Sequence, residues 1–171
     1  MLPKEFIQDV LIDEIGQIHR QHPYISFSLM AIGIEFLGKC LNKYGVWDKQ
    51  IKGKELPDFN RAIIELKSFY PYKKYLHSHK LRDSLRNGFL HSFVPKDKIS
   101  LSSKDEMSHL VVHNGVLNLK CEDFYNHFRL ACEEVIRKTD FRSNKIDSPF
   151  IHTPGVCESL TFSGSTLSIV S

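Results

Sequence analysis

The sequence contains few of the features that mark secreted, disulfide-bonded or membrane-spanning proteins. Its four cysteines form no Cys-x-x-Cys pair, which argues against a disulfide framework or zinc knuckle and favours reduced thiols in a cytoplasm. An acidic residue occurs within the first five positions, which is unlike a signal peptide. The apolar runs are interrupted too often to cross a bilayer, so we expect no membrane partner.

Familiar catalytic signatures are missing as well. There is no P-loop, no glycine-rich dinucleotide turn, no His-Glu-x-x-His motif and no nucleophile elbow. The formal net charge is only +3, which permits nucleic-acid binding without requiring it. Because these motifs are missing, we expect no cofactor and no metal.

The hydrophobic spacing predicts a mainly α protein. A chain of 171 residues with 42% hydrophobic content is long enough for one domain with a sizeable core. We expect a bundle of four to five helices over residues 1–140, with Asp58 as the N-cap of one of them. Residues 141–171 are rich in Ser, Pro, Thr and Gly and are expected to form a tail, either disordered or a weak hairpin. Apolar residues recur with a helical period in segments 4–20, 24–44, 58–69 and 122–138, the second being the most apolar and the expected central helix.

A β-hairpin is expected just before the last helix. Apolar runs flank Asn114-Gly115 and predict strands from His109 to Leu119, because both turn positions favour positive φ. We expect no parallel strands and no helix across this turn. His109 and His113 alternate in phase, as two metal ligands would, but no third ligand is evident. Ordinary strand or turn side chains are the favoured interpretation of both.

Segment 81–93 is predicted to be the helical segment around which the bundle is organised. The helix that contains it is expected to begin between residues 72 and 78. Leu81, Leu85 and Phe89 recur at i, i+4 and i+8, the spacing of a stripe that faces a core. Gly88 falls on the same side and would let another helix approach closely.

Four other side chains of this helix lie off the apolar stripe. Arg86 occupies one flank, whereas Asn87 and His91 share the other, and Arg86 and His91 are ~140° apart on a regular helical wheel. Leu90 lies between the flanks, away from the core, which suggests that this face meets a partner rather than water.

Arg86, Asn87 and His91 form an Arg-Asn-x-x-x-His motif, which resembles the signature of the HEPN superfamily. That signature is an Arg and a His separated by four to six residues, often with Asn directly after the Arg. The resemblance implies a HEPN-like helical bundle that forms a homodimer through the motif helix. In catalytic members, which include toxin and defence ribonucleases, two facing motifs form one composite site that cuts RNA without a metal.

The three residue types suit this chemistry. RNA carries its own nucleophile, the 2′-OH, and His91 would transfer protons to and from oxygen near neutral pH. Arg86 would bind the phosphate and stabilise its charge in the transition state. Asn87 would orient these groups, since it lies four residues before His91 on the same helix.

Further residues are candidates for supporting roles. His79 and Arg82 precede Arg86 with helical spacing and would form either a basic stripe that binds RNA or a solvated face. Glu35 lies in the most apolar helix and is expected either on its one wet strip or paired with Arg86, which it would then orient.

Three tyrosines and two lysines lie close together in the sequence, before the motif. Aromatic rings with interleaved bases can clamp single-stranded RNA, but a helix-packing surface with extended lysines is the favoured interpretation. The residues are Tyr70, Tyr72, Tyr75, Lys73 and Lys74.

Two functions of different classes follow from the sequence. One is a metal-independent endoribonuclease of toxin or defence type. The other is a non-catalytic HEPN-like dimer that binds a nucleotide or another protein, such as an antitoxin.

Overall fold

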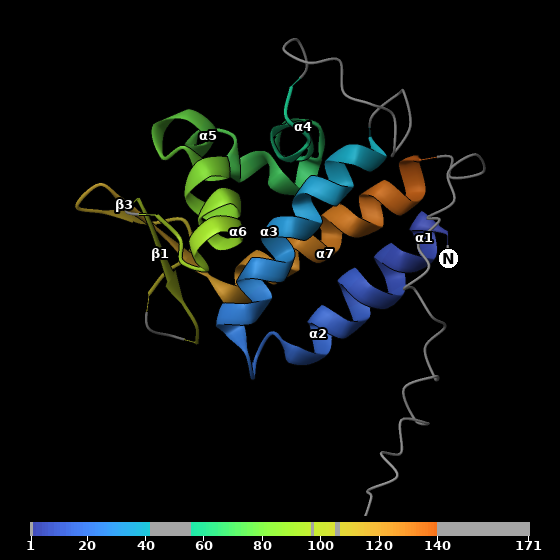
Figure 1. The fold of residues 1–171 in the computed structure, drawn as a ribbon, viewed down its shortest axis with the longest axis horizontal. Helices are drawn as coiled ribbons and strands as arrows, with labels where there is room; N and C mark the ends of the chain where they lie inside the picture. The colour runs from blue at the N-terminus through green and yellow to red at the C-terminus, as the bar shows by residue number, and fades with distance from the viewer. Residues whose placement is uncertain (1, 42–55, 97, 105–106, 140–171) are drawn as a thin grey trace, which may run out of the picture.

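The computed structural model describes residues 2–41, 56–96, 98–104 and 107–139, and this part of the chain is mainly helical with a small sheet before the last helix (Figure 1). The mainly α prediction is thereby confirmed. The expected tail at 141–171 lies outside the described residues. The elements in order are α1 (Pro3–Phe6), η1 (Ile7–Glu14), α2 (Ile15–Ile18), α3 (Pro23–Cys40), α4 (Asp58–Glu65), η2 (Lys67–Tyr72), α5 (Tyr75–Ser78), η3 (Arg82–Asn87), α6 (Gly88–Ser92), β1 (Ile99–Ser102), β2 (Val112–His113), β3 (Val116–Lys120) and α7 (Cys121–Lys138).

Several of these segments join into longer helices. The π-helical η1 continues α1 and leads directly into α2, and the π-helical η3 leads directly into α6. The first helix begins with proline at its first turn, where the missing amide hydrogen costs no intrahelical bond. The long helices of the described residues therefore correspond to the segments in which the sequence shows a helical period.

Helix α3 is the centre of the bundle, as its apolar sequence predicts. Figure 1 shows it running between α6 on one side and α7 and α2 on the other, and it also packs against α4. Gly38 makes the approach of α4 close, because a side chain there would overlap the backbone carbonyl of Asp58. The fully buried apolar side chains of α3 are Phe27, Met30, Ala31, Ile34 and Leu37.

The region after α4 differs from the expected helix 58–69. Pro57, not Asp58, is the N-cap, and the buried Asp58 carboxylate pairs with Arg61 instead of capping the helix. The helix ends at Glu65, and a 3-10 helix, η2, follows. The first amide of η2, on Lys67, donates to the carboxylate of Glu134 in α7 at 2.9 Å, which ties this segment to the last helix.

The β-hairpin is confirmed, but the sheet also contains a parallel pair that the sequence prediction excluded. Strands β2 and β3 are antiparallel, and the turn residues Asn114 and Gly115 have φ of 51° and 78°. Strand β1 pairs with β3 in parallel. The buried Asn118 amide explains the added strand, because it accepts from Ser100 at 3.1 Å and donates to Ser102 at 2.9 Å. These polar side chains are thus satisfied by pairing β1 with β3.

The motif helix starts later than predicted. The backbone turns at Lys80, where φ is 45°, so α5 and the helix that carries the motif are separate. Ser84 supports the new start by donating through its hydroxyl to the carbonyl of His79 at 2.9 Å. The stripe of Leu81, Leu85 and Phe89 is buried, as the spacing predicts.

Candidate functional site

A chain of polar contacts joins the centre of the bundle to the motif helix. Arg86 Nε donates to Glu35 Oε2, and Arg86 Nη1 donates to the side-chain oxygen of Asn87 at 2.9 Å. Asn87 in turn donates to the carboxylate of Asp83 at 2.7 Å. Of the two interpretations of Glu35, pairing with Arg86 is therefore confirmed, whereas Asp83 was not anticipated as the partner of Asn87.

The packing of η3 against α3 explains why Glu35 and Arg86 meet. Their side chains are 19% and 21% exposed, so the pair is partly withdrawn from water and more strongly attracted than a surface pair. Two of the guanidinium nitrogens are engaged, and Nη2 has no hydrogen-bond acceptor among the described residues. Arg86 is thus fixed along one edge while a further donor is left for a ligand.

His91 lies on α6, five residues after Arg86, and is exposed. Its imidazole ring has no hydrogen-bond partner among the described residues. The helix ends at Ser92, and Phe93 adopts a left-handed conformation with φ of 56°. His91 therefore stands at the exposed C-terminal end of the motif helix.

One expectation about this helix was wrong, and another depended on an assumption that does not hold. Gly88 does not face another helix: the chain folds back over it, and a Cβ there would lie 2.7 Å from the carbonyl oxygen of Val94. The predicted angle between Arg86 and His91 was calculated for a regular α-helix, but residues 82–87 are π-helical. Hydrogen bonds from i to i+5 change the rotation per residue, so the wheel does not apply across Arg86. Short π-helical turns occur frequently at functional sites.

The predicted basic stripe is not continuous. His79 caps the end of α5, on the other side of the turn at Lys80, where its ring packs against Tyr75 and its Nδ1 lies 2.9 Å from Ser78 Oγ. Burial, and then the nearby charge of Lys98, lower the pKa of His79. Arg82 does lie on the motif helix, with Nη1 3.9 Å from the carboxylate of Asp83. The structure therefore separates His79 from the motif and keeps Arg82 beside it.

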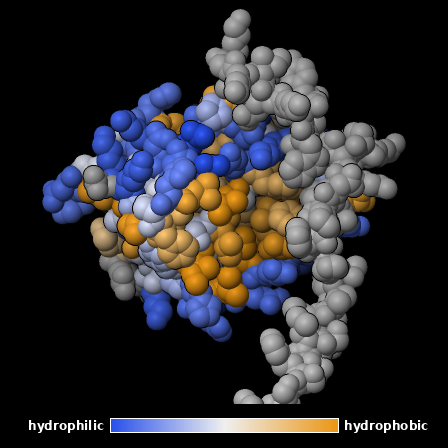
Figure 2. Space-filling model, in the orientation of Figure 1, coloured by the Kyte–Doolittle hydropathy of each residue, from blue (hydrophilic) through white to orange (hydrophobic). Residues whose placement is uncertain are grey.

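A hydrophobic surface adjoins the polar network. On α3, Ile25, Leu29 and Ile32 are exposed, and Figure 2 shows hydrophobic residues gathered on the face where α3 lies in front. At the end of α6, Leu90 and Phe93 are exposed as well, 46% and 59% respectively.

Tyr24 joins these two groups of hydrophobic residues. Its ring contacts those of Phe89 and Phe93, and its hydroxyl donates to the carbonyl of Phe93 at 2.6 Å. We call the surface formed by Tyr24, Ile25, Leu29, Ile32, Leu90 and Phe93 the α3–α6 apolar face.

A second polar cluster is found away from the motif, around Tyr72. The Tyr72 hydroxyl lies 2.7 Å from His109 Nε2 and 2.8 Å from His127 Nδ1. The amide of Lys120 donates to His109 Nδ1 at 3.0 Å, so the neutral ring carries its proton on Nε2 and donates it to Tyr72. Tyr72 must then donate to His127. No short-range spacing in the sequence signals this cluster, because its members come from three distant segments.

Burial perturbs the acidity of this cluster. It raises the pKa of Tyr72 well above its usual value, with Asp123 adding to the effect. Burial, and then the neighbouring His127, lower the pKa of His109 to about 4. Burial also lowers the pKa of His127. Both rings are thus neutral at physiological pH. His113 is exposed on β2 and is not among the hydrogen-bond partners of His109.

Neither the buried cysteines, nor a metal-ligand cluster, nor a membrane-spanning helix adds a site to this part of the chain. Cys40, Cys121 and Cys132 are buried free thiols, and burial raises the pKa of Cys40 and of Cys121 to about 12. The described residues contain no group of three or more His, Cys, Asp or Glu side chains that could hold a metal ion. Among the described helices, none combines the length and apolar character that a membrane span needs.

The chain was compared with known proteins in three ways. No protein-family model matches it, and neither the curated proteins nor the solved structures include a significant match. The functional argument therefore depends on the residues and their geometry.

Proposed function

We propose that this protein is a HEPN-like, metal-independent endoribonuclease of toxin or defence type that acts as a homodimer. The observation that carries the proposal is the contact chain from Glu35 through Arg86 to Asn87, with His91 exposed on the same helix. Glu35 holds the Nε edge of the guanidinium, so Arg86 needs little reorganisation to receive a phosphate. An exposed imidazole and a preorganised guanidinium suit metal-free RNA cleavage, because the first can transfer protons and the second can stabilise the charge of the phosphate.

A second copy of this chain is the expected occupant of the α3–α6 apolar face. This surface lies on the helices that carry Glu35 and the motif, and leaving it in water is unfavourable. A two-fold dimer would cover it and bring two copies of the motif together. His91 has no partner within its own chain's described residues, which suits a role completed by the partner subunit.

The proposed reaction uses only side chains of the motif. One His91 takes the proton of the 2′-OH as this oxygen attacks phosphorus, and the bond from phosphorus to the 5′-oxygen breaks. His91 of the partner subunit, in its protonated form, donates a proton to that leaving oxygen. Arg86 stabilises the added negative charge on the phosphate oxygens in the transition state. The products are a 2′,3′-cyclic phosphate and a 5′-hydroxyl end.

The test is incubation of the purified protein with mixed RNA in EDTA, with His91→Ala and His113→Ala alongside. Both histidines are exposed, so neither substitution should disturb the core. We expect cleavage by the wild type and by His113→Ala, loss of most activity in His91→Ala, and cyclic-phosphate ends. A metal requirement, or full activity in His91→Ala, would refute the mechanism.

One observation favours the second function, a non-catalytic HEPN-like dimer that binds a nucleotide or a protein such as an antitoxin. The charge of Arg86 is already balanced by Glu35, as it would be in a purely structural ion pair. Absence of cleavage by a protein that still forms a dimer would select this alternative.

A further inference from the structure

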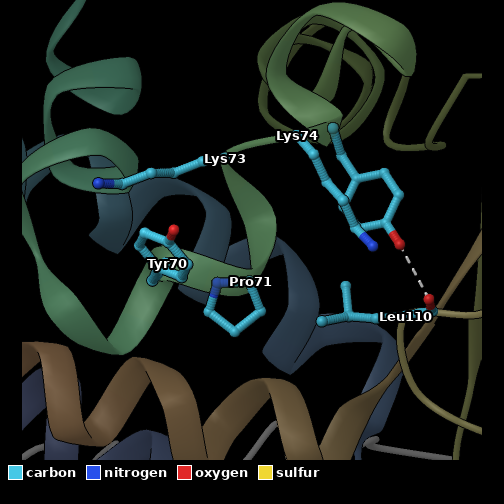
Figure 3. Close-up of a pocket in the computed structure, with 6 residues that line it drawn as sticks. Tyr70, Pro71, Lys73, Lys74 and Leu110 are labelled. Atoms are coloured by element: carbon cyan, nitrogen blue, oxygen red, sulfur yellow. Dashed lines mark hydrogen bonds between the residues drawn. The ribbon is translucent and has the colours of Figure 1, made fainter.

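A cavity on the other side of the turn at Lys80 has the chemistry of a ligand site. Its volume is about 390 Å³, which lies in the range of small-molecule pockets. Figure 3 shows Tyr70, Pro71 and Lys73 toward one side of the lining and Lys74 and Leu110 toward the other. Tyr75 and Lys73 complete the lining, so the described lining residues include two cations, two aromatic rings and no carboxylate.

The three tyrosines of this region have different roles. Tyr72 and Tyr75 are buried, as the packing interpretation predicts, but Tyr70 is 70% exposed. Lys73 Nζ lies over the Tyr70 ring, 5.0 Å from its centroid, and the large exposed area leaves ring surface for a second contact. Helix packing therefore does not explain Tyr70.

The charges of the cavity favour an anion. Lys74 Nζ lies 4.8 Å from the centre of the Tyr75 ring, beside the open space. Lysine ammonium groups bind phosphate as point charges. The exposed Tyr70 ring and the Lys74 ammonium line the same cavity, which matches a ligand that has a planar face and a phosphate.

The two walls of the cavity are fixed to one another before any ligand binds. Tyr75 donates through its hydroxyl to the carbonyl of Leu110 at 3.0 Å, and the Leu110 amide donates to the carbonyl of Asn118 at 2.9 Å. These two bonds hold Leu110 at φ of 57°, a conformation that costs free energy for this residue. Tyr72, which follows Pro71, and His109, which precedes Leu110, are also hydrogen-bonded to each other. The part of the lining formed by Tyr75 and Leu110 is therefore fixed and loses little entropy when a ligand binds.

We infer that this cavity binds a nucleotide, with the base stacked on Tyr70 and the phosphate paired with Lys74. Lys73 adds positive charge and stiffens the Tyr70 ring. The inference is independent of the proposed nuclease activity, because it uses none of the motif residues.

The test is calorimetric titration of the full chain with 5′-AMP, adenosine and inorganic phosphate at low ionic strength. AMP contains no internucleotide bond, so the result is the same whether or not the protein cleaves RNA. We expect AMP to bind at least about fivefold more tightly than adenosine or phosphate alone, since stacking and charge pairing act together. Equal affinity for phosphate alone, or no binding of AMP, would overturn the assignment.

Substitutions locate the binding. Tyr70→Ala should weaken AMP binding by at least about fivefold, whereas Tyr70→Phe, which keeps the ring, should retain it. Lys74→Ala should also weaken binding, and Lys4→Ala, an exposed lysine on α1, should not. Unchanged affinity in both Tyr70→Ala and Lys74→Ala would place AMP elsewhere and refute the site.

A final titration tests whether the ligand is a free nucleotide or a nucleotide within an RNA strand. A short 2′-O-methyl oligonucleotide cannot be cleaved by 2′-OH attack and is titrated in the same way. Tighter binding than AMP, with the same loss in Tyr70→Ala, would identify a segment of RNA as the ligand. Binding no tighter than AMP would identify the free nucleotide.

Discussion

Protonation of His109 should destabilise the fold as the pH falls below neutrality. In the native state its Nδ1 accepts from the Lys120 amide and its Nε2 donates to Tyr72, so a second ring proton would displace one of these bonds. The pKa of His109 is lowered to about 4, mainly by burial and then by the neighbouring His127. Asp123 raises this pKa, whereas Lys120 lowers it further. The unfolded chain, with an ordinary imidazole, takes up the proton first. Stability is therefore complete above about pH 6.5 and is lost as the pH falls toward 4.

The size of this loss follows from the shift. A pKa difference of about 2.5 units corresponds to at most ~3.4 kcal/mol. Because the His109 ring is only partly buried, we reduce this to ~2 kcal/mol. His127, whose pKa is also lowered by burial, contributes in the same direction.

The assay is urea unfolding followed by circular dichroism at pH 7 and pH 4.5. Carboxylates also respond to acid, so the informative quantity is the difference between the wild type and His109→Gln, which cannot titrate there. The wild type should lose more stability than the variant, by on the order of 1–2 kcal/mol. His113→Gln, at an exposed position of the hairpin, should behave as the wild type. If His109→Gln loses as much stability as the wild type, the reasoning about this ring is wrong.

Three further perturbations test the packing and the proposed interface. Tyr72→Phe should lower the free energy of unfolding at pH 7 by about 1–3 kcal/mol, because it removes the partner of two imidazole nitrogens; an unchanged urea midpoint would contradict this. Gly38→Ala should cost ~3 kcal/mol despite the better helix propensity of alanine, since its methyl group would overlap the carbonyl of Asp58; a stabilised variant in thermal melts would show that the helices can separate without cost. Leu90→Asp should convert a dimer at micromolar concentration to a monomer in light scattering, whereas the matched Leu130→Asp on α7 should not, and a monomeric wild type would exclude the proposed dimer.

The sequence alone was sufficient to predict where the main helices lie, although not where each begins and ends, and which turn joins the strands. Amphipathic spacing is local, and the buried stripe of Leu81, Leu85 and Phe89 follows it directly. Asn114-Gly115 likewise carries its own turn, because its backbone preference depends on no distant residue. The motif of Arg86, Asn87 and His91 was equally visible as spacing, although spacing cannot establish its activity.

The tertiary structure decided how these pieces meet. Glu35 could be assigned to Arg86 only when α3 and η3 were seen in contact, since 51 residues separate the two side chains. Ser100 and Ser102 alternate with apolar residues as in a strand, but the pairing of β1 with β3 depends on the buried amide of Asn118, which no local pattern marks.

The cluster of Tyr72, His109 and His127 shows most clearly the difference between what the sequence predicts and what the tertiary structure decides. No spacing in the sequence links the three residues to one another, and only packing withdraws them from water together. Helical period and turn chemistry act over a few residues and can be read from the chain. Hydrogen bonds and pKa shifts depend on which distant groups share a low-dielectric environment, and that is determined only when the chain has folded.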